Sequence, residues 1–210
     1  MHDMVPRCPL RGKVRIMRIV VINSVTLDGV AQAPARPDED RRGGFQHGGW
    51  GEPYADTVAA KAMGARMARP GALLLGRVTY EDFYAVWPKR KDGNPYTDRL
   101  NKTRKYVASR TLKEPLPWNN SVLLPGDAAE AVARLKNEEP AMDLCVLGSL
   151  NLVQSLVPAG LVDEYVLLIT PVLLGSGLRL FPDGGAFAKL HLVETTITTT
   201  GVIIATYRPA

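Results

Sequence analysis

Cysteine and histidine are scarce in this chain of 210 residues, which holds two cysteines and three histidines. Two cysteines are too few for a disulfide scaffold or for a zinc site built on cysteine pairs. Cys145 lies within an apolar run, where a buried and unreactive thiol is typical. His2, His47 and His191 never show the spacing of four residues that a helical metal site uses. The sequence therefore predicts no metal site, and its cysteine usage favours a cytoplasmic protein.

Long hydrophobic runs are missing as well. No stretch approaches the about 18 unbroken apolar residues that a membrane span needs, so we expect no membrane partner. The basic residues before Ile19 and the apolar residues after it resemble a secretion signal in part, but Asn23, Ser24 and Asp28 interrupt the apolar stretch. The β-branched residues of this stretch favour a first sheet strand instead.

Positive charge is in modest excess, because 26 basic residues outnumber 21 acidic ones and leave a net charge of +5. Part of the excess lies in residues 1–16, which we expect to form a disordered leader before a single domain over residues 17–210. The arginine-rich stretches lack interleaved aromatic residues and an RNA-binding signature, so we expect no nucleic-acid partner. The excess is also compatible with a phosphate-bearing small molecule.

Strand and helix patterns alternate along the chain from Met17 onward, which indicates an α/β domain. A long polar and glycine-rich loop over residues 31–53 interrupts them, and loops of this length inside a domain are often functional. The Ser/Thr-x-x-acid pattern at Thr79 predicts the start of a helix that ends before Pro88. Strands are predicted at 19–23, 72–75, 106–109, 121–124, 144–147 and 164–170, other helices at 54–69, 127–137 and 150–156, and a hairpin over 190–198 and 201–207.

Two predicted strands end in glycine, and a predicted helix follows each of them closely. The dipeptides are Gly76-Arg77 and Gly148-Ser149. Glycine lets a ligand approach the backbone, and the first N–H groups of a helix attract phosphate. Such junctions are also ordinary turns, so either motif alone is more often structural. Two of them on separate strands are compatible with the two ends of a pyrophosphate.

A third predicted strand ends in Ser109-Arg110-Thr111. A guanidinium group binds phosphate through paired hydrogen bonds, so Arg110 suits the 2′-phosphate that distinguishes NADPH from NADH. A solvated strand end explains the same residues without any ligand.

Several segments, taken in order, resemble the dihydrofolate-reductase-like superfamily. Within it, the resemblance is greatest to the reductase domain of the bifunctional riboflavin-biosynthesis deaminase–reductase. The similarity extends from about Met17 to Tyr207. The segments that carry it are 23–30 (NSVTLDGV), 74–81 (LLGRVTYE), 105–112 (KYVASRTL), 147–149 (LGS), 160–164 (GLVDE), 170–177 (TPVLLGSG) and 180–181 (LF).

The resemblance implies a three-layer α/β/α fold around a mixed, mostly parallel sheet with a C-terminal antiparallel hairpin. It also implies NADPH as the hydride donor and a homodimer. By position it assigns phosphate binding to two helix starts and the 2′-phosphate to the third strand end. The cofactor-binding residues would be Gly76, Arg77, Thr79, Ser109, Arg110, Gly148, Ser149 and Leu150.

The substrate side of the site is less clearly marked in the sequence. Asp28, after the first strand, is our candidate for orienting the substrate or assisting its protonation, although a turn residue before Gly29 explains it as well. Phe45, His47 and Trp50 are candidates for contact with the nicotinamide or with a flat heterocycle, and core packing explains them almost equally.

The resemblance therefore predicts an NADPH-dependent reductase of a small pyrimidine- or pterin-like substrate, similar to 5-amino-6-(5-phosphoribosylamino)uracil reductase. The zinc signature of the deaminase half, His-x-Glu with Pro-Cys-x-x-Cys, is absent, which excludes deamination. The segment 39–50 is longer than the corresponding loop of dihydrofolate reductases. True dihydrofolate reduction and a non-catalytic, nucleotide-binding dimer remain the alternatives.

Overall fold

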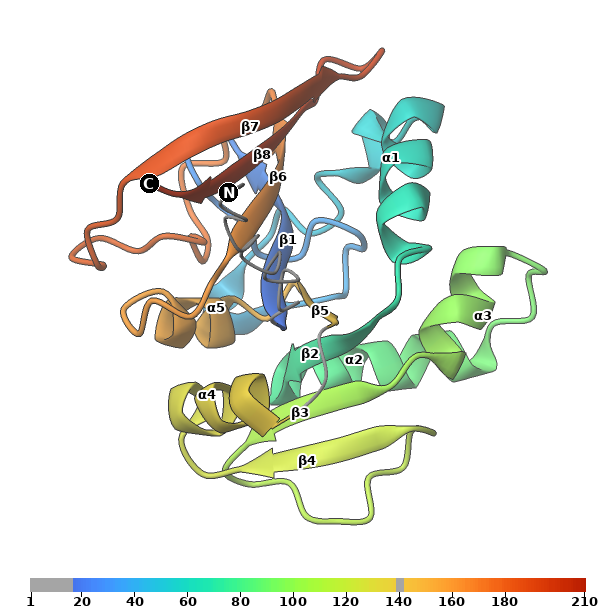
Figure 1. The fold of residues 1–210 in the computed structure, drawn as a ribbon. Helices are drawn as coiled ribbons and strands as arrows, with labels where there is room; N and C mark the ends of the chain where they lie inside the picture. Colours follow the sequence, from blue (N-terminus) through green and yellow to red (C-terminus); the bar gives the residue numbers. More distant parts are fainter. Residues whose placement is uncertain (1–16, 139–141) are drawn as a thin grey trace, which may run out of the picture.

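The computed structural model describes residues 17–138 and 142–210, so the predicted disordered leader over 1–16 lies outside the described residues. In these ranges eight strands form one sheet, in the order β4-β3-β2-β5-β1-β6-β8-β7 (Figure 1). The strands are β1 (Arg18–Thr26), β2 (Gly71–Gly76), β3 (Lys105–Ser109), β4 (Ser121–Pro125), β5 (Asp143–Leu147), β6 (Glu164–Thr170), β7 (Leu190–Ile197) and β8 (Ile203–Pro209).

The sheet is parallel from β4 to β6, and only its C-terminal part departs from this. β8 pairs antiparallel with both β6 and β7, and β7 and β8 form the predicted hairpin. Because the six parallel strands share one direction, the carboxyl ends of β2, β3 and β5 meet at the same edge of the sheet.

Helices cover both faces of the sheet, with α4 and α5 on one face and α1, α2 and α3 on the other (Figure 1). The alternation of side chains along each strand sorts the core in the same way. On β2, Leu74 packs on the α4–α5 face, while Leu73 and Leu75 pack with α2 and α3. The helices are α1 (Thr57–Met67), α2 (Arg77–Val86), α3 (Pro95–Lys102), α4 (Ala128–Glu138) and α5 (Leu150–Leu156). The predicted three-layer α/β/α fold is therefore confirmed.

Two local expectations differ from the structure. α2 begins at Arg77, directly after the strand, so Thr79 is inside the helix and not its cap. The sequence analysis gave no helix for α3, because that segment is polar and buries only Thr97 and Leu100. Its start is nonetheless encoded locally, since Asn94 caps it by accepting a hydrogen bond from the Tyr96 N–H group.

Candidate functional site

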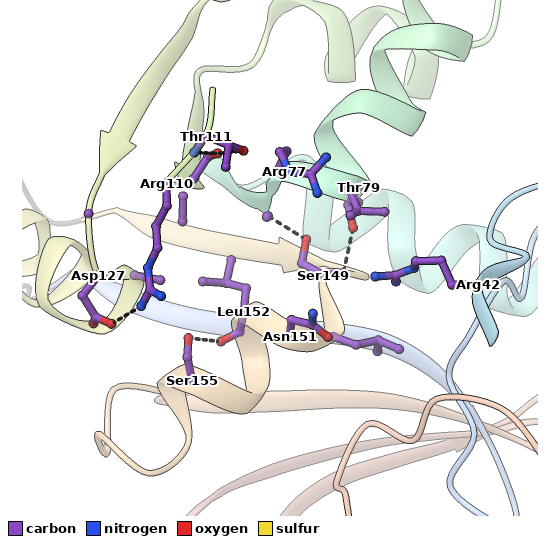
Figure 2. Close-up of a pocket in the computed structure, with 17 residues that line it drawn as sticks. Arg42, Arg77, Thr79, Arg110, Thr111, Asp127, Ser149, Asn151, Leu152 and Ser155 are labelled. Atoms are coloured by element: carbon purple, nitrogen blue, oxygen red, sulfur yellow. Dashed lines mark hydrogen bonds and ion pairs between the residues drawn. The ribbon is translucent and has the colours of Figure 1, made fainter. Parts of the chain in front are cut away.

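A cavity of about 460 Å³ lies at the carboxyl ends of β2, β3 and β5 (Figure 2). Its volume is within the range of small-molecule sites. The cavity brings together the three strand ends that the sequence analysis singled out. Of the eight predicted cofactor residues, all but Gly148 line it, namely Gly76, Arg77, Thr79, Ser109, Arg110, Ser149 and Leu150.

Hydrogen bonds join the start of α2 to the start of α5. The Ser149 Oγ atom accepts from the Gly76 N–H group at 3.0 Å, and the Ser149 N–H group donates to Thr79 Oγ1 at 3.0 Å (Figure 2). Thr79 therefore does not cap its own helix but links the two junctions. These bonds fix the two helix starts relative to one another, as a ligand that spans both would require.

The turn between β5 and α5 has an unusual backbone. Gly148 and Ser149 both have positive φ, at 58° and 55°. Glycine adopts this conformation without strain, whereas serine adopts it at a cost that is of the order of 1–3 kcal/mol. The side chain of Asn23, on β1, supports the turn by donating to the Gly148 carbonyl at 3.1 Å. Strain that is held in place by several hydrogen bonds is typical of functional sites.

Two predicted arginines reach the cavity with much of their side chains exposed. Arg77 pairs with Glu81 at 2.8 Å, one turn further along α2. Arg110 pairs with Asp127 at 3.1 Å and is 75% exposed. The pKa of Asp127 lies below its ordinary value, because it accepts hydrogen bonds from the first N–H groups of α4 and, more weakly, from Arg110. Both guanidinium groups retain free N–H donors for an anion.

Ser109 contributes to the cavity wall mainly by shaping the turn after β3. Its Oγ atom accepts from the N–H groups of Thr111 and Leu112, at 3.1 and 3.0 Å. The turn places Arg110 beside the start of α4, across the cavity from Arg77 (Figure 2). The hydroxyl of Ser109 is therefore an acceptor within the protein, and its O–H lies 3.5 Å from Thr111 Oγ1, at the limit of a hydrogen bond that a ligand acceptor could replace.

Sequence analysis missed one cationic residue of the cavity, Arg42, which comes from the loop over residues 31–53. Its guanidinium donates to both carboxylate oxygens of Asp40, at 2.8 and 2.6 Å. The hydrogen bond to Asp40 raises the pKa of Arg42. No signal in the sequence links Arg42 to the strand ends, because it lies 34 residues before Gly76 in a loop with two other arginines, Arg36 and Arg41.

The structure places Asp28 outside this cavity, in contact with the loop that follows β6. Its carboxylate accepts hydrogen bonds from the Thr26 hydroxyl, from the Gly175 N–H at 2.7 Å and from the Leu174 N–H at 3.3 Å. These bonds, led by that of Thr26, hold the pKa of Asp28 below its ordinary value. The side chain is therefore an anion that joins two loops, and its predicted role toward the substrate stays a prediction.

The three predicted substrate residues also lie outside the cavity. Phe45 and Trp50 are buried in a small apolar cluster with Val30 and Ala33. His47 is exposed, and its ring lies edge-on to Phe45 with centroids 5.7 Å apart. In the structure, Phe45 and Trp50 pack inside the loop that carries them. The predicted contact of the three residues with a substrate stays a prediction.

A second, smaller cavity of about 150 Å³ lies on the opposite face of the sheet, between the strands and the helices α1 and α3. Ser24 and Tyr96 supply its polar groups. Burial, with a smaller contribution from nearby Cys145, raises the pKa of Tyr96 to about 12. Sequence analysis missed this site because it missed α3. The other lining residues are apolar, namely Ile22, Met63, Met67, Leu147 and Leu168.

Residues 17–138 and 142–210 contain neither a metal-binding cluster nor a helix suited to a membrane. Within these ranges, no cluster of three or more histidine, cysteine, aspartate or glutamate side chains is arranged to hold a metal ion. None of the described helices is both long enough and apolar enough to cross a membrane.

The sequence comparisons agree with the resemblance. The family model of the RibD C-terminal domain matches residues 18–204, which is most of the chain. The uncharacterized protein YyaP of Bacillus subtilis (strain 168) is 32% identical over 140 residues, which are 64% of this chain and 72% of that protein.

The structural comparisons show the same fold. A protein from Shewanella sp. PV-4 that is described as a riboflavin biosynthesis protein superposes with a TM-score of 0.67 at 21% identity, over 92% of this chain and 99% of that one. Dihydrofolate reductase from Enterococcus faecalis, in complex with NADP(H) and RAB-propyl, superposes with a TM-score of 0.57 at 14% identity, over 91% of this chain and 96% of that one.

Proposed function

Because the chain belongs to the family of the RibD C-terminal domain, we propose that it is a reductase that transfers a hydride from NADPH to a small pyrimidine- or pterin-like heterocycle. The observation that carries the proposal is the convergence of three strand ends and three arginines on one cavity. The reaction resembles that of 5-amino-6-(5-phosphoribosylamino)uracil reductase. The proposal includes a cytoplasmic location, which the scarcity of cysteine supports.

The donors in the large cavity fit the phosphate groups of NADPH. Arg77 and the first N–H groups of α2 would hold one part of the pyrophosphate, since a helix start and a guanidinium both favour negative charge. Arg110 and Ser109 lie on the far side of the cavity and would hold the 2′-phosphate. Gly148 and Ser149 would shape the turn that the nucleotide crosses.

In this mechanism the cofactor supplies the hydride, and the protein aligns the reactants and excludes water. We propose that the acceptor ring enters the smaller cavity, because Leu147 at the end of β5 is only two residues from Ser149 in the larger one. A volume near 150 Å³ is sufficient for a single ring the size of benzene. None of the described residues that line it carries a charge, so phosphate or carboxylate groups of the acceptor would remain outside.

Tyr96 and Ser24 are the polar groups that would orient the acceptor. With a pKa of about 12, Tyr96 keeps its proton at neutral pH and acts as a hydrogen-bond donor. Asp28 is an anion under the same conditions, which makes it a poor acid. We therefore propose that Asp28 orients the substrate indirectly, by holding the loop around Gly175.

The direct test is titration of the purified protein with NADPH and with NADH, followed by fluorescence or calorimetry. We expect saturable binding of NADPH and at least tenfold weaker binding of NADH, because a charge-assisted phosphate contact contributes about 1.5–3 kcal/mol. Absence of saturable NADPH binding would refute the proposal. Equal affinity for NADPH and NADH would contradict the role of Arg110 toward the 2′-phosphate and would leave the other assignments of the cofactor site unaffected.

Turnover separates the remaining alternatives. The decrease of NADPH absorbance is followed with dihydrofolate, with 5-amino-6-(5-phosphoribosylamino)uracil and with unphosphorylated single-ring analogues. Oxidation of NADPH by a pyrimidine supports the proposed reaction, and oxidation by dihydrofolate alone would replace it with folate reduction. Binding of NADPH without turnover on any of them would favour a non-catalytic nucleotide-binding protein.

We also propose that the protein is a homodimer. β7 is an edge strand of the sheet, and Leu192 and Ile197 on it are exposed apolar side chains, as is Ile203 on β8. Exposed apolar edges of this kind are usually covered by another chain. Light scattering on the purified protein tests this, and a monomer at micromolar concentration would contradict it.

A further inference from the structure

Arg42 is the one described lining residue that the loop over residues 31–53 contributes to the large cavity. In Figure 2 it approaches from the side opposite Arg110 and points toward Ser149 and Asn151. It is therefore separated from the position proposed for the 2′-phosphate, and it lies beside the junction between β5 and α5.

A buried glutamine fixes the backbone on which Arg42 stands. Gln32 is 2% exposed, and its Nε2 group donates to the carbonyls of Arg42 and Asp40, at 3.0 and 3.3 Å. Its Oε1 atom accepts from the Leu178 N–H at 2.9 Å. The amide group of Gln32 thus uses both of its donor hydrogens and one acceptor position, as a buried polar side chain requires.

The same loop is anchored at two further points. The Trp50 indole N–H donates to the Gln32 carbonyl at 2.7 Å, within the apolar cluster that includes Phe45. Arg36 donates to Asp82 on α2 at 2.5 Å. The loop is therefore packed against α2, and these contacts hold the backbone of Arg42 at the edge of the cavity.

The guanidinium itself is only partly used. Its Nε and one Nη2 hydrogen bind Asp40, while a guanidinium carries five N–H donors. The side chain of Arg42 is 47% exposed, whereas that of Asp40 is 13% exposed. Asp40 therefore orients the guanidinium from the protein side and leaves its outer donors directed at the cavity.

We propose that Arg42 binds the diphosphate group of the cofactor, and that Gln32 is the positioning residue that sets its reach. This inference rests on the proposed function, since it concerns the same nucleotide. It also predicts a coupling between the nucleotide and the loop over residues 31–53, which binding at the strand ends alone would not produce. The cofactor diphosphate would contact a residue of the loop that also carries Trp50 and Phe45. Nucleotide binding would therefore stabilise that loop, and substitutions that disturb the loop would weaken nucleotide binding.

The first test compares Arg42→Ala with Arg41→Ala, titrated with NADPH and NADH. Arg41 is the adjacent arginine, contacts the Pro37 carbonyl and does not line the cavity, so it is matched for charge and position in the chain. We expect Arg42→Ala to bind both NADPH and NADH about tenfold or more weakly than the wild type, and to leave the ratio of the two affinities unchanged. Arg41→Ala is expected to bind both within twofold of the wild type.

The outcomes separate this inference from the proposed function. If the wild type binds no NADPH, the proposed function fails. If the wild type binds NADPH and Arg42→Ala binds it equally well, only the role of Arg42 is overturned. If Arg42→Ala selectively loses NADPH and keeps NADH, Arg42 binds the 2′-phosphate and the assignment to the diphosphate is wrong. Arg42→Lys, which keeps the charge and loses the paired donors, is expected to bind with intermediate affinity.

The role of Gln32 is tested by Gln32→Glu, which has nearly the same shape but lacks the two donor hydrogens. We expect it to weaken NADPH binding by a similar factor, and the double variant Gln32→Glu/Arg42→Ala to bind no more weakly than Arg42→Ala alone. A thermal melt of each variant reports folding separately. Additive losses in the double variant would show that Gln32 acts on the fold and not through Arg42.

Discussion

Arginines gather at both ends of the central sheet, and the two groups are held in opposite ways. At the amino ends of β1, β5 and β6, three arginines converge on Glu164, whose side chain is 3% exposed. Arg66 and Arg208 contact it at 3.0 and 2.8 Å, and Arg18 lies at 3.7 Å while it also binds Asp143. The guanidinium donors at this end are directed at the buried Glu164 and the half-buried Asp143.

At the carboxyl ends, Arg42, Arg77 and Arg110 surround a cavity instead. Arg77 and Arg110 pair with carboxylates at the protein surface, and such pairs contribute little to stability. Neither the net charge of +5 nor the number of arginines distinguishes the two ends. The burial of Glu164, compared with the exposed partners of Arg77 and Arg110, does distinguish them. Arg42 is intermediate, because its partner Asp40 is 13% exposed while its own side chain is 47% exposed. A buried carboxylate with several guanidinium groups stabilises the fold, whereas exposed pairs leave donors for a ligand.

The largest expected effect concerns the amino end. Replacing Glu164 with alanine removes a buried carboxylate and leaves Arg66, which is 15% exposed, and the more exposed Arg208 without their shared partner. We expect the free energy of unfolding to fall by about 3–5 kcal/mol, the usual cost of breaking a buried ion pair. Urea denaturation measures it, with Glu81→Ala as the exposed control, for which a change within about 0.5 kcal/mol is expected. A loss as small as that of the control would contradict the contrast between the two ends.

The next effect concerns the carboxyl end and is expected in binding. Arg77→Ala removes a guanidinium whose own partner, Glu81, is exposed, so we expect unfolding to change little. The Kd for NADPH is expected to rise by an amount equivalent to about 1–3 kcal/mol. Arg134→Ala on α4 is a suitable control, because Arg134 is exposed and forms a similar pair with Glu130. If the two variants bind NADPH equally, Arg77 is not a phosphate ligand.

A smaller effect is expected when pH is lowered. Burial alone would raise the pKa of Glu164, but hydrogen bonds from Arg208 and Arg66 outweigh it and hold the pKa below the ordinary value. The unfolded chain then binds a proton more readily than the folded one, so this part of the stability is present above the ordinary pKa and is lost as pH falls through the folded pKa. When denaturation is measured at a series of pH values from 7 to 3, the free energy of unfolding is therefore expected to decrease more steeply for the wild type than for Glu164→Gln. Parallel curves would contradict the lowered pKa.

The sequence predicted features that are encoded locally and missed those that depend on distant pairs. Gly76 and Gly148 were recognised because strand, glycine and helix follow one another along the chain. Arg42 was missed because only the folded loop brings it to the cavity. The Glu164 network was missed for the same reason, since Arg66 lies 98 residues away from it. Thr79 matched a capping pattern, yet its hydroxyl accepts from Ser149, 70 residues further along.

The smallest expected effect concerns Asp28, which lies between the two interpretations. The sequence analysis assigned it a role toward the substrate, and the structure gives it hydrogen bonds to Thr26, Leu174 and Gly175. Asp28→Asn keeps the shape of the side chain but loses the charge and one acceptor oxygen. We expect the free energy of unfolding to fall by only about 0.5 kcal/mol, because the variant still accepts hydrogen bonds through its remaining oxygen and the bond from Gly175 is exposed to solvent.

Turnover decides between the two roles of Asp28. If it acts only by holding the loop, Asp28→Asn changes KM for the acceptor and leaves the dependence of kcat on pH unaltered. If it donates a proton to the substrate, kcat itself falls by about 10²-fold or more, and the decrease of kcat as pH rises through the pKa of Asp28 disappears from the pH profile. We expect the first result, because a carboxylate that already accepts these hydrogen bonds and has a lowered pKa holds no proton to give at neutral pH.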